Sequence, residues 1–114
     1  MPPDVNDVLP LTVGSFHILL ALAEGEQHGY AIAKEVESTT LGRVKLGPTT
    51  LYRTIRQLLD DGWIVETTRA ADGDARKRLY RLTTRGRTIA AAEAQRLADL
   101  VRIARERRLI PALA

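Results

Sequence analysis

The chain has 114 residues, of which 45% are hydrophobic and none is cysteine. This length fits one domain with a modest core, to which burial through dimerisation would add stability. Without cysteine, the sequence excludes a disulfide framework and a thiolate metal site. The N-terminus lacks the early basic cluster of a signal peptide, and the apolar run within residues 16–23 is far shorter than the roughly 20 residues of a membrane span. We therefore expect a soluble, cytoplasmic protein without a membrane partner.

The net charge of +3 is unevenly distributed along the chain. Residues 1–42 hold one lysine and six acids, whereas residues 43–87 hold eleven lysines or arginines and five acids. Residues 88–114 hold five arginines and three acids. A concentration of positive charge in the middle segment is typical of a protein that binds a polyanion. The alternative is a solvated basic face without a partner.

The first third of the chain predicts an arm and two helices. Three prolines within residues 1–10 predict a flexible N-terminal arm. Residues 12–23 predict a helix with Thr12 as its N-cap, and this helix is apolar nearly all round, so it is expected to be buried on more than one side. After a glycine-containing break, residues 30–37 predict a second helix, in which we interpret Tyr30 as a core residue with a hydrogen-bonded hydroxyl.

Residues 47–62 predict a third helix with two distinct faces. Pro48 suits the first helical turn, and Gly62 suits a left-handed C-terminal cap. An apolar stripe with spacing i, i+4, i+7 and i+8 predicts a buried face. The opposite face carries side chains that can reach phosphates and base edges, the alternative being an ordinary exposed helix surface. The predicted DNA contacts in this region are Lys45, Thr49, Thr50, Tyr52, Arg53, Arg56 and Gln57.

A basic β-hairpin is predicted directly after this helix. Residues 63–69 and 78–83 predict its two strands, and the Asp72-Gly73 pair predicts its turn. The basic residues beside the tip favour contact with a DNA backbone or a narrow minor groove, the alternative being an edge strand kept soluble by its charge. The fold class is therefore predicted as α+β, mostly α, a winged helix-turn-helix. The predicted contacts of its wing are Arg76, Lys77 and Arg78.

A last helix is predicted over residues 85–108, capped by Thr83 or Thr84. Its apolar side exceeds what so small a domain can cover, and the natural cover is a second copy of the chain. The predicted domain organisation is an arm over residues 1–10, a winged helix-turn-helix over residues 11–83 and a dimerisation helix over residues 84–110. The predicted dimer contacts are Phe16, Leu20, Ile89, Leu97, Leu100, Val101 and Ala104.

No catalytic constellation appears in the sequence. Histidine is not paired with a nucleophile, and no glycine-rich loop could cradle a phosphate. His17 and His28 lack a third ligand at useful spacing, so both are interpreted as hydrogen-bonded structural residues rather than metal ligands. We predict that the chain is not an enzyme and uses no metal or other cofactor.

Three segments carry a family resemblance: LTVGSFHILLALAEGEQHGYAIAKEVE at 11–37, LGPTTLYRTIRQLLDDGWI at 46–64 and RKRLYRLTTRGR at 76–87. Together they resemble the PadR family of bacterial transcriptional regulators. The resemblance implies a dimeric winged helix-turn-helix repressor of the short-tailed subgroup, in which the last helix is a main dimer contact. Some relatives capture flat aromatic drugs between tryptophans of these last helices. This chain departs from them, because its only tryptophan is Trp63.

The predicted function is a sequence-specific, homodimeric repressor that binds double-stranded DNA and joins the nucleoid when bound. Its operator is expected to be a pseudo-palindrome with half-sites about 34–36 Å apart, or a multiple of that. One alternative is a regulator that responds to a small-molecule effector in a pocket at the dimer interface. Another is a winged-helix protein-interaction module that does not bind DNA.

Overall fold

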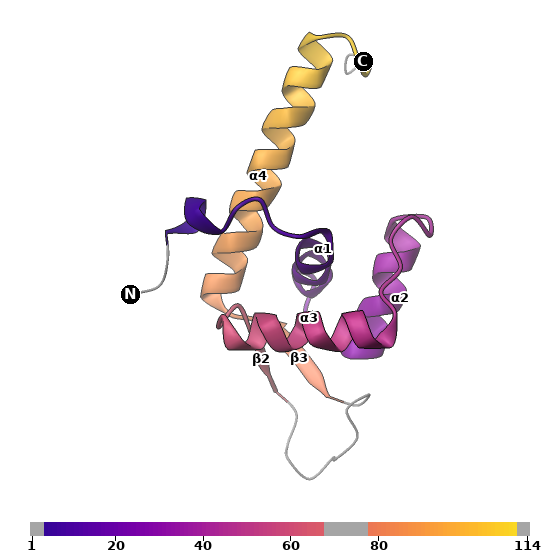
Figure 1. Ribbon diagram of the computed structural model, residues 1–114, viewed down its shortest axis with the longest axis vertical. Coiled ribbons are helices and arrows are strands. Elements are labelled where there is room, and N and C mark those ends of the chain that lie inside the picture. Colours follow the sequence, from indigo (N-terminus) through magenta and orange to yellow (C-terminus); the bar gives the residue numbers. More distant parts are fainter. Residues whose placement is uncertain (1–3, 68–77, 112–114) are drawn as a thin grey trace.

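The computed structural model describes residues 4–67 and 78–111, and most of them are helical. Three short strands form one antiparallel sheet. Figure 1 shows α1 at the centre, α2 and α3 beside it, the sheet at one end and the long α4 rising towards the other. The elements in chain order are the 3-10 helix η1 (Val5–Val8), α1 (Val13–Leu22), β1 (Gln27–His28), α2 (Gly29–Thr39), α3 (Pro48–Asp60), β2 (Ile64–Glu66), β3 (Leu79–Leu82) and α4 (Thr84–Glu106).

The hydrophobic core is built around α1. Its residues Ile18 and Leu19 are fully buried, whereas Val13 and Leu20 on its other side are 61% and 48% exposed. Each of α2, α3, the sheet and α4 adds buried apolar side chains to the same cluster. The expected burial of α1 on more than one side stays a prediction, because Val13 and Leu20 are exposed in the single chain. The core residues from the other elements are Ile32, Val36, Leu51, Ile55, Leu58, Ile64, Tyr80, Leu82 and Ile89.

Several helix ends form as the sequence predicts. The Thr12 side chain caps α1 by accepting a hydrogen bond from the Ser15 amide at 3.2 Å. Pro48 occupies the first turn of α3, where a missing amide hydrogen does no harm. Gly62, with φ of 78°, ends that helix in the left-handed conformation that glycine adopts without a steric penalty. These caps fix the two limits of α3 and lead the chain directly into β2.

The sheet has the order β1-β3-β2, with β3 in the middle. β2 and β3 form the predicted hairpin, with Ile64 opposite Leu82. β1 is not predicted from the sequence, because its residues lie in the glycine-containing break between the first two predicted helices. It pairs Gln27 with Tyr80, so its hydrogen-bonding partner lies more than fifty positions further along the chain. A strand of two residues has no periodicity that a sequence pattern could reveal. β1 forms because its residues pair with β3, the return strand of the hairpin.

The N-terminal segment lies against α4 rather than forming the predicted loose arm throughout. Residues 5–8 form η1, and Asp4 caps this short helix by accepting from the Asn6 amide at 2.9 Å. Further along, the Leu11 amide donates to the Glu93 carboxylate of α4 at 2.8 Å. Residues 5–8 are therefore helical where the sequence predicts an arm, and the flexibility of that arm stays a prediction.

Two further expectations about single side chains are wrong. Tyr30, expected in the core, is 58% exposed. Ile89, expected at a dimer contact, is fully buried in the chain's own core and has no surface left for a second subunit. For His17, expected to be a hydrogen-bonded histidine, the Nδ1 atom is buried without a partner among residues 4–67 and 78–111.

Within those same residues, no helix is long and apolar enough to cross a membrane.

Candidate nucleic-acid interface

α3 has one buried face and one exposed face. Its residues Leu51, Ile55 and Leu58 are 3%, 2% and 0% exposed and hold the helix against the core. The predicted DNA-contacting face points to solvent, as the spacing of the apolar residues requires. Five of its predicted contact residues are exposed, and they are Thr49, Thr50, Arg53, Arg56 and Gln57.

The N-terminal end of α3 is open. Gly47 is the N-cap and supplies no side-chain hydrogen bond to the first turn. The amide of Leu51 is the first to donate within the helix, to the Gly47 carbonyl at 2.8 Å, and the amides of Thr49 and Thr50 come before it and have no acceptor within the helix. Free amides and the positive end of the helix dipole both favour an anion at such an end. This end of α3 therefore suits a phosphate group.

The charged and amide side chains of the exposed face make only weak, solvent-exposed interactions within the chain. Arg56 pairs with Asp60 at 3.4 Å, with 77% and 59% of the two side chains exposed. The Gln57 amide donates to Asp61 at 3.1 Å. Arg53 pairs with no acidic group in the described part of the chain. Exposed pairs of this kind stabilise a protein by no more than about 1 kcal/mol, so an external anion or base edge can replace them.

Tyr52 and Lys45 connect α3 to α2. The Tyr52 ring lies over Gly29, and a Cβ at Gly29 would stand only 3.0 Å from the ring carbon Cε1. The Tyr52 ring therefore packs against the start of α2. Lys45 pairs with Glu37 of α2 at 3.9 Å, and both side chains are more than half exposed. Lys45 is therefore placed beside α3 rather than on it.

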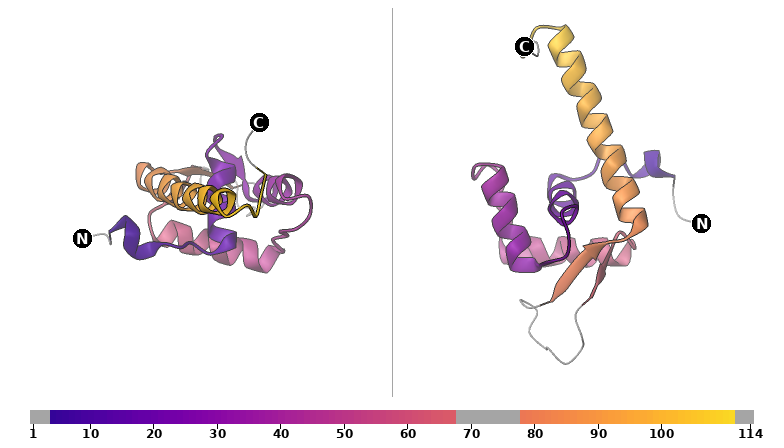
Figure 2. Two further views of the ribbon diagram at one scale, coloured as in Figure 1. Left: turned by 90° about the horizontal axis from the view of Figure 1, so that it is seen from above. Right: turned by 180° about the vertical axis from the view of Figure 1, so that it is seen from behind.

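The hairpin lies at the same end of the molecule as α3, opposite the C-terminal end of α4 (Figures 1 and 2). Within it, Arg78 pairs with Glu66 of the neighbouring strand at 3.1 Å and keeps about half of its side chain exposed. Behind this pair, burial raises the pKa of the Tyr80 phenol, and the nearby Glu66 carboxylate raises it further. The predicted contacts Arg76 and Lys77 and the predicted Asp72-Gly73 turn lie outside the described residues.

The predicted dimer contacts, apart from Ile89, keep exposed surface. On α4, Leu100 and Val101 are 51% and 41% exposed, and Leu97 and Ala104 beside them are partly buried. On α1, Leu20 is 48% exposed and Phe16 is partly buried. The second half of α4 extends beyond the rest of the chain in Figures 1 and 2, so its apolar side chains lie apart from the core. Their contact with a second copy stays a prediction.

Sequence reasoning missed one feature beside α3. On α2, the Lys34 ammonium lies 5.0 Å from the centroid of the exposed Tyr30 ring. Lys34 is the only lysine or arginine among the first 42 residues, and that isolation was the signal available in the sequence.

No cluster of three metal-ligating side chains occurs among the residues that the structure describes.

Three helices, a short sheet with a hairpin, and an exposed face on the third helix define a winged helix-turn-helix protein. The family described as "Transcriptional regulator PadR-like family" matches residues 18–92. The chain therefore belongs to the PadR-like family of transcriptional regulators. It is similar to transcriptional regulator Rv3488 of Mycobacterium tuberculosis, with 36% identity over 86 residues that cover 75% of this chain and 77% of that protein.

Solved structures support the same fold. A transcriptional regulator from Clostridium thermocellum superimposes with a TM-score of 0.68 at 24% identity, covering 82% of this chain and 87% of that one. RosR of H. salinarum superimposes with a TM-score of 0.64 at 22% identity, covering 91% of this chain and all of that one. At these identities the likeness shows the fold alone.

Proposed function

We propose that this regulator is a repressor that binds a specific double-stranded DNA operator as a homodimer. The observation that carries the proposal is the exposed face of α3, which bears Arg53, Arg56 and Gln57 on a helix whose N-terminal end is open. Arginine can pair bidentately with guanine, and glutamine with adenine, in the major groove. Such a protein would act in the cytoplasm, on the nucleoid, without catalysing a reaction.

In the proposed complex, α3 and the hairpin would contact different parts of the DNA. α3 would lie in the major groove, with Arg56 and Gln57 at base edges and the hydroxyls of Thr49 and Thr50 at phosphates. The hairpin would lie along the adjacent backbone, where Arg78 can exchange its exposed pair with Glu66 for a phosphate. Phosphate contacts would set the register, and the base contacts would supply the sequence preference.

A second copy would cover the apolar surface that the monomer leaves exposed. Leu100 and Val101 of α4 and Leu20 of α1 carry this surface, and all three are more than 40% exposed. A symmetric pair would present two α3 helices, so the operator would contain two inverted half-sites about 34–36 Å apart, or a multiple of that. Occupation of this operator would block polymerase.

The assignment of α3 can be tested with charge-matched variants. We would measure binding of the full chain to a fluorescent duplex by anisotropy for Arg53→Ala, Arg56→Ala and the control Arg102→Ala. Arg102 is exposed on α4 and pairs with Glu106 at 3.1 Å, so its loss changes the net charge equally but touches no DNA in the proposed complex. Each α3 variant is expected to lose about 1–3 kcal/mol of binding free energy. Equal losses in all three variants would show that α3 is not the contact surface.

A further inference from the structure

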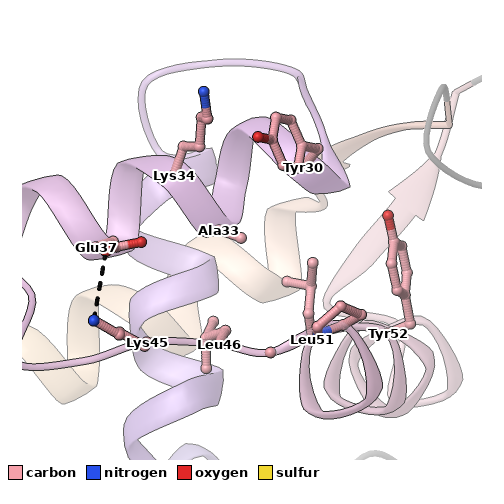
Figure 3. A pocket seen from close by; sticks show the side chains of 10 residues that line it. Tyr30, Ala33, Lys34, Glu37, Lys45, Leu46, Leu51 and Tyr52 are labelled. Atoms are coloured by element: carbon pink, nitrogen blue, oxygen red, sulfur yellow. Dashed lines mark ion pairs between the residues drawn. The ribbon is translucent and has the colours of Figure 1, made fainter.

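A hollow of about 460 Å³ lies between α2 and the start of α3 (Figure 3). Its apolar walls include Ala33 of α2, Leu46 of the connection and Leu51 of α3, and the rings of Tyr30 and Tyr52 stand at one end. Pockets for small ligands range from about 300 to 1,000 Å³ and are mostly apolar with a few polar groups. The hollow is therefore of a size and character that suit a small molecule.

The way in which α2 and α3 meet leaves this space open. At one end they touch, because Gly29 has no side chain to keep the Tyr52 ring away. At the other end, the connection over residues 40–47 separates them. The Thr40 hydroxyl donates to the Val36 carbonyl at 2.7 Å and accepts from the Val44 amide at 3.1 Å, which fixes the course of this connection. The hollow is thus formed before any ligand arrives.

The rim of the hollow is positively charged on balance. Lys34, Lys45 and Glu37 line the hollow. Figure 3 shows the exposed Lys34 side chain turned away from Leu46 and Leu51, so its ammonium would have to swing towards the hollow to meet a ligand. Glu37 is held by Lys45 in an exposed pair at 3.9 Å. Lys34 has no acidic partner in the described part of the chain, and its ammonium stands over the face of Tyr30. Lys34 is therefore available for an anion.

We propose that this hollow is the effector site of the regulator and binds a small amphipathic anion. The apolar body of the ligand would lie against Leu46, Leu51 and the two tyrosine rings, and its anionic group would pair with Lys34. This inference rests on the proposed function, because its consequence is a change in DNA binding. Lys45 and Tyr52, two of the predicted DNA contacts, line the hollow, so a ligand there covers part of the surface that would contact DNA. Occupation of the site lowers the affinity for DNA.

Anilinonaphthalene sulfonate is a suitable probe, because it combines an aromatic body with one anionic group and fluoresces in apolar surroundings. Titration of the full chain is expected to show one saturable site per chain. Ala33→Trp, which fills the hollow, should abolish this site, and Lys34→Ala should weaken it at least about fivefold, a difference of about 1 kcal/mol. Lys34 is exposed, so its variant keeps the test valid even if the tryptophan variant fails to fold.

Leu109→Ala is the matched control, since it removes exposed apolar surface after the end of α4 and Leu109 does not line the hollow. Its titration should equal that of the natural chain. Probe binding that survives Ala33→Trp in a folded protein, or that disappears in Leu109→Ala, would place the probe elsewhere and overturn the proposal.

The regulatory consequence is measured separately. Saturating probe should weaken binding of the natural chain to a duplex and leave that of Ala33→Trp unchanged. An unchanged affinity in the natural chain would overturn the effector role. Lys34→Ala that weakens DNA binding in a protein without a probe site would assign the hollow to the DNA backbone instead. If the chain binds no DNA at all, the proposed function fails, while the probe titration still reports on the site.

Discussion

Gly86 of α4 lies directly against the main chain of Trp63, so closely that a Cβ at position 86 would overlap the Trp63 carbonyl oxygen. The same carbonyl accepts a hydrogen bond from the Thr83 amide at 3.1 Å. The first turn of α4 therefore packs against Trp63, the residue just before β2. This contact fixes the direction in which α4 leaves the winged helix-turn-helix.

Replacing Gly86 by alanine is expected to destabilise the fold. The added methyl group meets backbone rather than a flexible side chain, so relief requires movement of α4 or of the hairpin, at about 1–3 kcal/mol or more. Urea unfolding of Gly86→Ala measures this loss. Gly14→Ala is the matched control, because its Cβ would meet only side-chain atoms at 3.7 Å and 3.9 Å. The control should be neutral or gain up to about 1 kcal/mol from helix propensity, and equal stabilities would refute the contact.

Thr83 is expected to matter more than its neighbour Thr84. Its hydroxyl accepts from the Gly86 amide at 2.9 Å and donates to the Gly62 carbonyl at 2.7 Å, so it caps α4 and ties it to the end of α3. Thr83→Ala should lose about 1–2 kcal/mol of unfolding free energy. Thr84→Ala, at an exposed position one residue on, should lose little. A larger loss in Thr84→Ala would mean that Thr84 is the cap.

The buried carboxylate of Glu93 makes stability depend on pH. Hydrogen bonds from Arg96 lower the Glu93 pKa most, and the Leu11 amide lowers it further, against a burial effect that raises it. A lowered folded-state pKa stabilises the fold above the unfolded pKa of about 4.3, and this contribution disappears as the pH falls through the folded value. Glu93→Gln should therefore reduce stability at pH 7 and flatten its decline in acid. Urea titrations at several pH values measure this, with the exposed Glu106→Gln as control.

An unchanged acid decline in Glu93→Gln would contradict this role of Glu93. In that case other carboxylates would set the pH dependence, and the link between Leu11 and α4 would contribute little to it.

The apolar surface of α4 should hold two copies together. Leu100→Asp places a charge in the middle of this surface and is expected to shift the chain from dimer to monomer in sedimentation experiments. Arg102→Asp changes the same helix at a polar, exposed position and should leave the dimer intact. Dimers that persist in Leu100→Asp would mean that a different surface joins the subunits.

The sequence allowed prediction of those parts that depend on local pattern. The stripe of Leu51, Ile55 and Leu58 predicted the buried face of α3, and Thr12 and Gly62 marked helix ends through their own chemistry. These features depend on residues within one or two helical turns. The main elements of the fold therefore followed from periodicity and capping.

Other features depend on contacts between distant segments. Gly86 reads as a weak helix residue until Trp63 is placed beside it. Glu93 interrupts an apolar stripe, and only the Leu11 amide and Arg96 explain its burial. Tyr30 looks like a core residue by composition, yet it is exposed beside Lys34. Of the predicted interface, the exposed face of α3 followed from spacing, whereas the hollow next to it did not.

Selection of bound sequences from random duplex DNA, with the full chain at near-physiological salt, decides whether the protein binds an operator as a dimer. We predict enrichment of an inverted repeat whose half-sites are centred one helical turn apart, about 34–36 Å, or a multiple of that. In Arg56→Ala the preference should relax at one base position in each half-site. Binding without enrichment, or no binding, would contradict a dimeric operator-binding repressor.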